Sequence, residues 1–96
     1  MKDFIRVMKA LSETNRVKIL KILQEGPLCV CEIRTALGIS QPTVSCHLKV
    51  LEEHRYVKVK KEFVGRKPQT SYMVTEAGRR AFRDHLEGLE KVIRGT

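Results

Sequence analysis

Hydrophobic residues recur at steps of three and four through the first half of the chain, which is the spacing of one face of an α-helix. Phe4, Met8 and Leu11 predict a first helix over about residues 2–11. A second helix follows that is apolar over much of its surface and therefore central, and Gly26-Pro27 ends it. Its apolar residues are Val17, Ile19, Leu20, Ile22 and Leu23.

Two short helices joined by a glycine come next. Residues 32–37 predict the third helix, and Gly38 can end it in a left-handed conformation. Ser40 is a suitable N-cap for the fourth helix, expected over residues 40–53, and Pro42 falls in its first turn, where a missing N–H costs little. This pair is a helix-turn-helix. The apolar face of the fourth helix consists of Val44, Leu48 and Leu51.

Beyond the fourth helix the period changes from helical to alternating. Val57 and Val59 alternate with lysines, which predicts a strand with one buried face. Residues 65–68 predict a turn, after which alternation resumes on a return strand. We therefore expect a two-stranded hairpin with a basic tip. The alternating residues of the return strand are Thr70, Tyr72 and Val74.

Thr75 and Glu76 mark the start of a last helix, as its cap and as an acid in its first turn. Its apolar stripe consists of Phe82, Leu86, Leu89 and Ile93. The expected fold class is mainly α with a small β-hairpin, the winged helix-turn-helix. A chain of 96 residues is long enough for one such domain, over residues 1–96, and too short for two.

The first and last helices both carry apolar stripes that a small three-helix core has little room to cover. One interpretation is that both stripes simply pack on their own core. We favour a homodimer in which these two helices form the interface, because most soluble oligomers are twofold dimers and basic recognition helices are commonly used in pairs.

The chain is strongly basic, with 19 Lys and Arg against 11 Asp and Glu, a net charge of +8 and a pI near 9.8. This excess indicates a polyanionic partner, nucleic acid before an acidic membrane surface. No stretch approaches the roughly 18 apolar residues of a membrane span, and the first residues lack the apolar run of a signal peptide. Three cysteines without framework spacing are typical of a cytoplasmic protein with reduced thiols.

The outer face of the fourth helix offers short polar side chains, and residues 41–49 contain no acid. An α-helix fits the major groove of B-DNA, where such side chains read base edges, and Gln41 suits adenine. His47 is expected either to pack inside the protein or to face a phosphate. The expected contacts of this helix with double-stranded DNA are Ser40, Gln41, Thr43, Ser45, Cys46, His47 and Lys49.

The hairpin adds four basic side chains that suit the DNA backbone or minor groove beside the helix. The alternative is that they only form a solvated basic loop. The first interpretation predicts DNA binding that weakens steeply with salt. These residues are Lys60, Lys61, Arg66 and Lys67.

Three motifs follow one another in the first 60 residues: Met8-Lys9-Ala10-Leu11-Ser12 with Asn15-Arg16-Val17-Lys18-Ile19-Leu20, then Leu28-Cys29-Val30-Cys31-Glu32-Ile33, then Ser40-Gln41-Pro42-Thr43-Val44-Ser45. In this order they resemble the ArsR/SmtB family of bacterial and archaeal metalloregulatory repressors, over roughly residues 4–60. The resemblance implies a dimeric transcriptional repressor with an inverted-repeat operator. From Gly65 onward the chain is more like repressors of the multiple-antibiotic-resistance type, which implies the same activity.

Cys29 and Cys31 fall in the stretch that resembles the family's arsenic site. The family's third cysteine would stand where this chain has Arg34. Side chains at positions i and i+2 of a helix point about 200° apart, whereas in an extended segment they share a face. The pair is expected either to bind As(III), Sb(III) or another thiophilic ion as an inducer, or to be small buried thiols kept reduced. No cofactor is required.

The sequence does not favour an enzyme, because it shows no nucleophile with a base, no paired carboxylates and no glycine-rich phosphate loop. Asp84-His85 lacks the spacing of the family's other metal site. Two alternatives to an inducible repressor are a winged-helix regulator without metal sensing and a winged helix that binds protein. As an exposed thiol at the DNA face, Cys46 would make DNA binding sensitive to oxidation.

Overall fold

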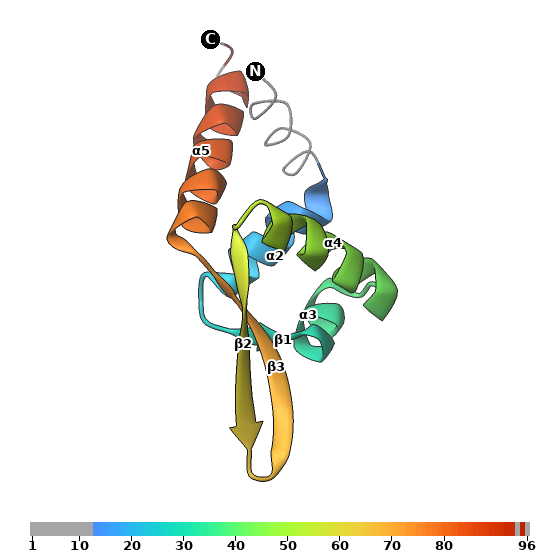
Figure 1. Ribbon diagram of the computed structural model, residues 1–96. Helices are drawn as coiled ribbons and strands as arrows, with labels where there is room; N and C mark the ends of the chain where they lie inside the picture. The colour runs from blue at the N-terminus through green and yellow to red at the C-terminus, as the bar shows by residue number, and fades with distance from the viewer. Residues whose placement is uncertain (1–12, 94, 96) are drawn as a thin grey trace.

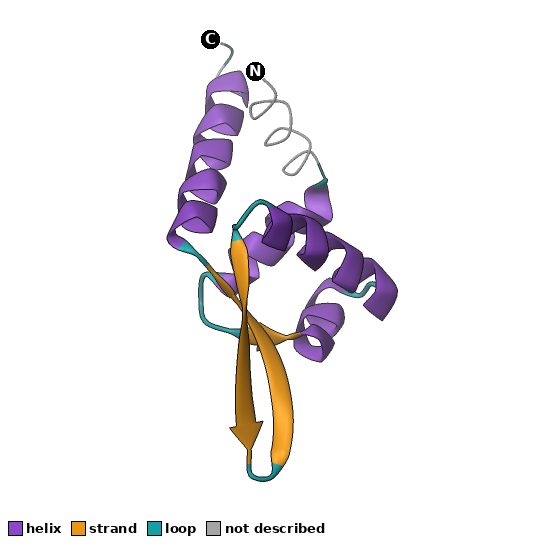
Figure 2. Ribbon diagram, in the orientation of Figure 1, coloured by secondary structure: helices purple, strands orange, loops and turns teal. Residues whose placement is uncertain are grey.

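The computed structural model describes residues 13–93 and residue 95. Helices and strands follow in the expected order, with one added strand, β1 (Figures 1 and 2). The first helix expected over residues 2–11 lies outside the described residues. The described elements are α2 (Thr14–Leu23), β1 (Leu28–Cys29), α3 (Val30–Leu37), α4 (Gln41–Glu53), β2 (Val57–Val64), β3 (Lys67–Val74) and α5 (Glu76–Ile93).

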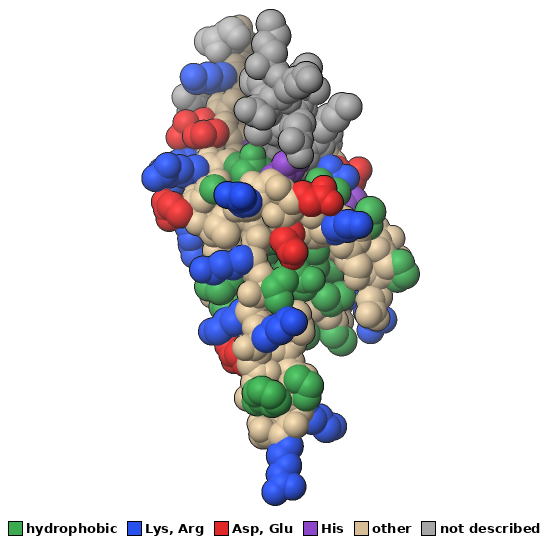
Figure 3. All heavy atoms as spheres, in the orientation of Figure 1, with side chains coloured by type: hydrophobic (Ala, Val, Ile, Leu, Met, Phe, Trp, Pro, Cys, Tyr) green, Lys and Arg blue, Asp and Glu red, His purple; other side chains and the backbone are tan. Residues whose placement is uncertain are grey.

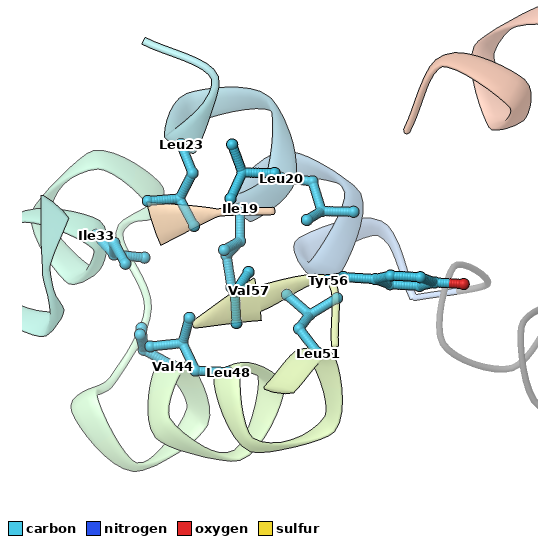
Figure 4. Packing of buried hydrophobic residues seen from close by; sticks show 10 residues of the cluster. Ile19, Leu20, Leu23, Ile33, Val44, Leu48, Leu51, Tyr56 and Val57 are labelled. Atoms are coloured by element: carbon cyan, nitrogen blue, oxygen red, sulfur yellow. The ribbon is translucent and has the colours of Figure 1, made fainter. Parts of the chain in front are cut away.

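The core lies where α2, α3 and α4 meet the base of the hairpin (Figure 4). Ile19 and Leu20 of the central helix α2 are completely buried. The apolar face predicted for the fourth helix is confirmed, since Val44, Leu48 and Leu51 are all buried in this core. Burial of these side chains holds α4 against α2, so the outer face of α4 has a fixed direction.

The turn between α3 and α4 has the geometry that the sequence predicts. Gly38 adopts φ 66° and ψ 33°, and its N–H donates to the carbonyl of Arg34 over 2.8 Å. Glycine takes this left-handed conformation without strain, which is why it ends α3. Ser40 caps α4, because its Oγ accepts from the N–H of Thr43 over 3.4 Å, and Pro42 lies in the first turn.

The hairpin belongs to a three-stranded antiparallel sheet in the order β1-β3-β2. The prediction of two strands is therefore incomplete. The third strand, β1, has only two residues and so shows no alternation in the sequence. Its residue Cys29 pairs with Ser71 of β3, which ties the start of α3 to the hairpin.

The turn of the hairpin is shorter than predicted. Val64 pairs with Lys67, so only Gly65 and Arg66 connect the strands, and Pro68 lies within β3. Gly65 has φ 67°, which the first central residue of a tight hairpin turn requires. Pro68 interrupts no pairing with β1, because β1 reaches only residues 71 and 72 of β3.

Most of the hairpin extends away from the core (Figures 1 and 2). Its base is covered, with Val57 and Val74 buried, whereas Val59 is already 37% exposed. The predicted buried face of the first strand is therefore wrong beyond Val57. Alternation follows from the backbone geometry of any strand, but burial of a face depends on what else packs against it.

Helix α5 starts against the segment between α4 and β2. Oγ1 of Thr75 donates to the carbonyl of Arg55 over 2.6 Å and accepts from the N–H of Gly78 over 3.0 Å, which confirms Thr75 as the cap. Gly78 is buried, and a Cβ there would collide with the backbone carbonyl of Tyr56. This close approach fixes the direction in which α5 leaves the domain.

The predicted apolar stripe of α5 leaves the core after its first two turns. Phe82 packs against the core, whereas Leu86, Leu89 and Ile93 are exposed, as is Val92. The helix points away from the hairpin (Figure 1). None of the described helices has both the length and the apolar character needed to cross a membrane. The homodimer interface expected on α5 stays a prediction.

Candidate nucleic-acid interface

The outward side of α4 carries polar side chains predicted to read DNA. Gln41, Ser45, Cys46 and Lys49 are exposed, on the side opposite the buried apolar face. Helix α3 packs beside α4 and leaves this side open (Figure 1). Residues 41–49 contain no acid that would repel a phosphate, and the acids of α4, Glu52 and Glu53, follow only in its last turn. The domain thus presents an uncovered helix with donors, acceptors and a positive charge, which suits a major groove.

Two of the predicted contact residues already bind each other. Oγ of Ser40 and Oγ1 of Thr43 lie 2.7 Å apart, in addition to the capping bond that Ser40 accepts. Ser40 is exposed and Thr43 is half-buried. Within the domain the Ser40 hydroxyl satisfies the N–H of Thr43, which the helix leaves unpaired in its first turn, and the Thr43 hydroxyl bonds to that of Ser40.

His47 does not lie on the outward face. It is 9% exposed, and its Nδ1 accepts a hydrogen bond of 3.2 Å from Nε of Arg16 on α2. The structure places its ring in the packing between α2 and α4, which is the first of the two expectations for this residue, and off the face predicted to contact DNA. The spacing explains this, since position 47 follows Val44 by three residues and precedes Leu51 by four, and so shares their face.

The ribbon formed by β2 and β3, here called the wing (residues 57–74), carries the predicted basic side chains. Lys61, Arg66 and Lys67 are exposed. Lys60 differs, because its Nζ lies 2.6 Å from Oε1 of Glu62. An exposed ion pair of this kind is weak, so Glu62 lowers the attraction of Lys60 for an external anion but does not remove it.

The wing also carries two large apolar side chains for which the alternating sequence pattern predicts no function. Phe63 is 76% exposed and Val64 is 59% exposed, directly before the turn. Figure 3 shows hydrophobic side chains between basic ones near the end of the ribbon. The sequence signal for them is an aromatic residue at the end of an alternating strand, next to a basic turn.

Cys29 and Cys31 lie at the start of α3, but in different backbone conformations. The helix begins at Val30, two residues earlier than predicted, so Cys31 is helical and Cys29 is the extended N-cap residue. Nη2 of Arg34, where the family's third cysteine would stand, lies 4.0 Å from Sγ of Cys31. The two cysteines do not share the extended segment that would put both thiols on one face.

Glu32 explains the early start of α3. Its Oε1 accepts from the N–H of Cys29 over 3.2 Å, and the two residues form a capping box. The hydrogen bond from the Cys29 thiol, followed by the one from the Cys29 backbone, lowers the pKa of the Glu32 carboxyl below its ordinary value. A glutamate at the third helical position is a readable signal, whereas cysteine is an uncommon N-cap.

The described residues do not complete a three-thiolate metal site. Within residues 13–93 and 95, no three His, Cys, Asp or Glu side chains come together to hold a metal ion. Cys29 and Cys31 supply two thiols, and the guanidinium of Arg34 is no ligand. Any thiophilic ion held by this pair alone would have to take its remaining ligands from elsewhere.

Comparison with known proteins agrees with this geometry. A family model described as a winged helix DNA-binding domain matches residues 15–93. The chain is 36% identical over 61 residues to the arsenical resistance operon repressor of Staphylococcus aureus, which covers 64% of this chain and 59% of that repressor. The matched part therefore spans about three fifths of the length of this curated relative.

Solved structures are similar over nearly the whole chain. The transcriptional repressor BigR of Xylella fastidiosa is 30% identical with a TM-score of 0.71, over 95% of this chain and 83% of that one. A homodimeric winged helix-turn-helix domain of Mycobacterium bovis, described as a possible ArsR-family regulator, is 29% identical with a TM-score of 0.72, over 97% and 79%. These matches confirm the expected fold class and the resemblance to ArsR/SmtB regulators. Since one family model extends from α2 through the wing to α5, the chain belongs to the family of winged helix DNA-binding domains.

Proposed function

We propose that this protein is a transcriptional repressor that binds double-stranded DNA with α4 in the major groove and with the wing on the flanking backbone. The observation that carries the proposal is the combination of an open face on α4, free of acids over residues 41–49, with a protruding basic ribbon on the same small core. Repressors among the relatives support it. Repression follows if the bound domain simply blocks access to the DNA.

The test begins with selection of bound duplexes from a random library, followed by fluorescence anisotropy at several salt concentrations. The double variant Arg66→Gln/Lys67→Gln is expected to lower both the affinity and the steepness of the salt dependence, by about two in the logarithmic slope. Arg80→Gln/Arg83→Gln on α5 removes the same charge and is the control. A complex insensitive to salt would contradict the proposal, and failure to retain any duplex would favour a winged helix that binds protein.

We further propose a homodimer through residues 2–11 and α5. The exposed apolar side chains of α5 and the homodimeric relative from Mycobacterium bovis support it. Twofold symmetry predicts an inverted-repeat operator with half-sites about one helical turn apart. Leu89→Glu is expected to yield monomers in sedimentation equilibrium, with Glu90→Gln on the same helix as control. A dimer that persists in Leu89→Glu would count against this interface.

A thiophilic inducer acting at Cys29 and Cys31 is the second part of the proposal. The arsenical resistance repressor among the relatives supports As(III) or a similar ion. The Cys29 thiol contributes to the capping box with Glu32, so a bond from its sulfur to such an ion would open the start of α3. Because α3 packs against α4, a change there would reach the DNA-reading helix.

Arsenite titrated into the protein–DNA complex tests this part. Wild type is expected to leave the DNA, and Cys29→Ser/Cys31→Ser is expected to stay bound. Cys46→Ser serves as the matched control, because it removes a thiol from the same protein without touching α3. If arsenite, antimonite and cadmium all leave the wild-type complex intact, the alternative of a regulator without metal sensing is correct.

A further inference from the structure

Two apolar side chains at the end of the wing contribute little to the fold. Phe63 and Val64 remain 76% and 59% exposed, far along a ribbon whose base alone is buried. A phenylalanine that exposed stabilises the domain hardly at all, because little of its surface leaves the water on folding. Large apolar side chains that the fold does not bury remain available to a binding partner.

The register of the hairpin places these side chains on opposite faces of the ribbon. Consecutive strand residues point to opposite sides, so Phe63 and Val64 flank the ribbon from both faces. Phe63 pairs with Pro68, and Val64 pairs with Lys67. The end of the wing is therefore a narrow element with an apolar side chain on each face.

Positive charge surrounds this apolar end. Lys61 lies on the same strand face as Phe63, and Arg66 and Lys67 form or follow the turn. The acid of β2, Glu62, is engaged by Lys60 at 2.6 Å. A complementary partner presents apolar surface bordered by negative charge.

We propose that Phe63 and Val64 enter the DNA minor groove beside the half-site that α4 reads, where they contact deoxyribose walls and base edges while Arg66 and Lys67 meet the phosphates. The inference rests on the proposed DNA binding. The minor groove offers apolar sugar walls between two phosphate rows, and proteins that bind it insert apolar side chains such as phenylalanine there. The guanine amino group obstructs the groove floor, so A·T flanks fit these side chains better than G·C flanks.

The experiment compares wild type with Phe63→Thr/Val64→Thr, which keeps the charge of the strand and has β-branched residues, which favour strands, at both positions. The selected duplex is prepared with A·T or G·C pairs in its flanks. The variant is expected to lose about tenfold in affinity on A·T flanks, because two apolar side chains no longer leave water on binding. It is also expected to lose the preference for A·T while keeping the salt slope of wild type.

Hydroxyl-radical footprinting separates the wing from α4. Wild type should protect the deoxyriboses of the flanks, and the threonine variant should lose that protection while both proteins still shield guanine N7 in the half-site. Equal affinity, flank preference and protection in the two proteins would show the inference wrong although DNA binding holds. If wild type retains no duplex at all, the proposed function itself fails.

The same variant also tests other partners for this surface. Its melting temperature should match that of wild type, since both side chains are exposed. Its oligomeric state in sedimentation should match as well. A dimer that dissociates in the threonine variant, with an unchanged footprint, would assign the apolar end to self-association and overturn the assignment to DNA.

Discussion

Nε of Arg16 on α2 donates a hydrogen bond to Nδ1 of His47 on α4 over 3.2 Å. A guanidinium can only donate, so Nδ1 of His47 acts as the acceptor and carries no proton. The bond joins the central helix to the helix that faces DNA, and the ring that receives it is buried. We therefore expect His47 to influence DNA binding only through the position of α4.

His47→Ala should therefore change mainly the stability of the protein, and Lys49→Gln mainly its DNA affinity. His47→Ala removes a buried ring and one acceptor of Arg16, and we expect it to lower the free energy of unfolding by about 1–3 kcal/mol. When DNA binding is measured well below the melting temperature, the affinity of this variant should stay within about twofold of wild type. Lys49→Gln should leave stability unchanged and weaken DNA binding. Urea unfolding and anisotropy on both variants measure this, and a stable His47→Ala that binds poorly would restore His47 as a contact.

Glu62→Gln is expected to strengthen DNA binding. The substitution releases Lys60 from its 2.6 Å ion pair and removes a negative charge from the wing. Affinity at low salt should rise about threefold, and the gain should vanish at high salt, because it comes from an exposed charge. The control is Glu76→Gln, which breaks an exposed pair with Arg80 of 3.8 Å on α5. An equal gain from both variants would mean that net charge alone is responsible.

Gly78→Ala and Gly88→Ala lie on the same helix but should change the stability of the protein in opposite directions. At Gly78 a methyl group collides with the carbonyl of Tyr56 and crowds Val74, so we expect destabilisation by about 1–3 kcal/mol. At Gly88 a Cβ meets no atom within 4 Å, so alanine should stabilise α5 by about 0.5–1 kcal/mol. Thermal unfolding of the two variants measures both effects. Tolerance of Gly78→Ala would show that α5 does not start as closely against Tyr56 as described.

The Glu32 carboxyl gives the start of α3 a pH dependence. Its folded pKa lies below the ordinary 4.5, because the Cys29 thiol and then the Cys29 N–H donate to it. The stabilisation is therefore complete above the unfolded pKa and is lost as the pH falls through the folded pKa. The stability difference between wild type and Glu32→Gln should be larger at pH 6 than at pH 3.

Cys29→Ala provides the companion measurement for Glu32. It removes the thiol hydrogen bond, the larger cause of the lowered pKa, and keeps the backbone bond. The pKa of Glu32, followed by NMR titration, should move up toward its ordinary value in this variant. An unchanged pKa would show that the thiol does not donate to the carboxylate.

Signals that act within one turn of chain were readable from the sequence. Gly38 was expected to end α3, and Ser40 and Thr75 were expected to start the following helices. Each does so through a hydrogen bond to a residue three or four positions away. Where the local signal was unusual, as with Cys29 at an N-cap, the predicted start of α3 was two residues late.

Features that depend on distant contacts were less accessible. The two residues of β1 become a strand only because β3 supplies partners far along the chain, as in the pair of Leu28 with Tyr72, 44 positions later. The alternation of β2 predicts the observed strand, but its burial ends after Val57 because no other element that the structure describes covers the ribbon. The exposure of Phe63 follows from the same fact.

By itself, the sequence determined the apolar faces of the helices, their caps, the alternating hairpin and the basic charge, and with them the winged helix-turn-helix fold. These properties depend on residues close together in the chain and on total composition, which a single sequence contains. The folded arrangement was needed to show that His47 turns inward to Arg16, that Glu62 pairs with Lys60, and that Phe63 lies away from the core. Those outcomes depend on which side chains the folded chain places against one another, and periodicity carries no such information.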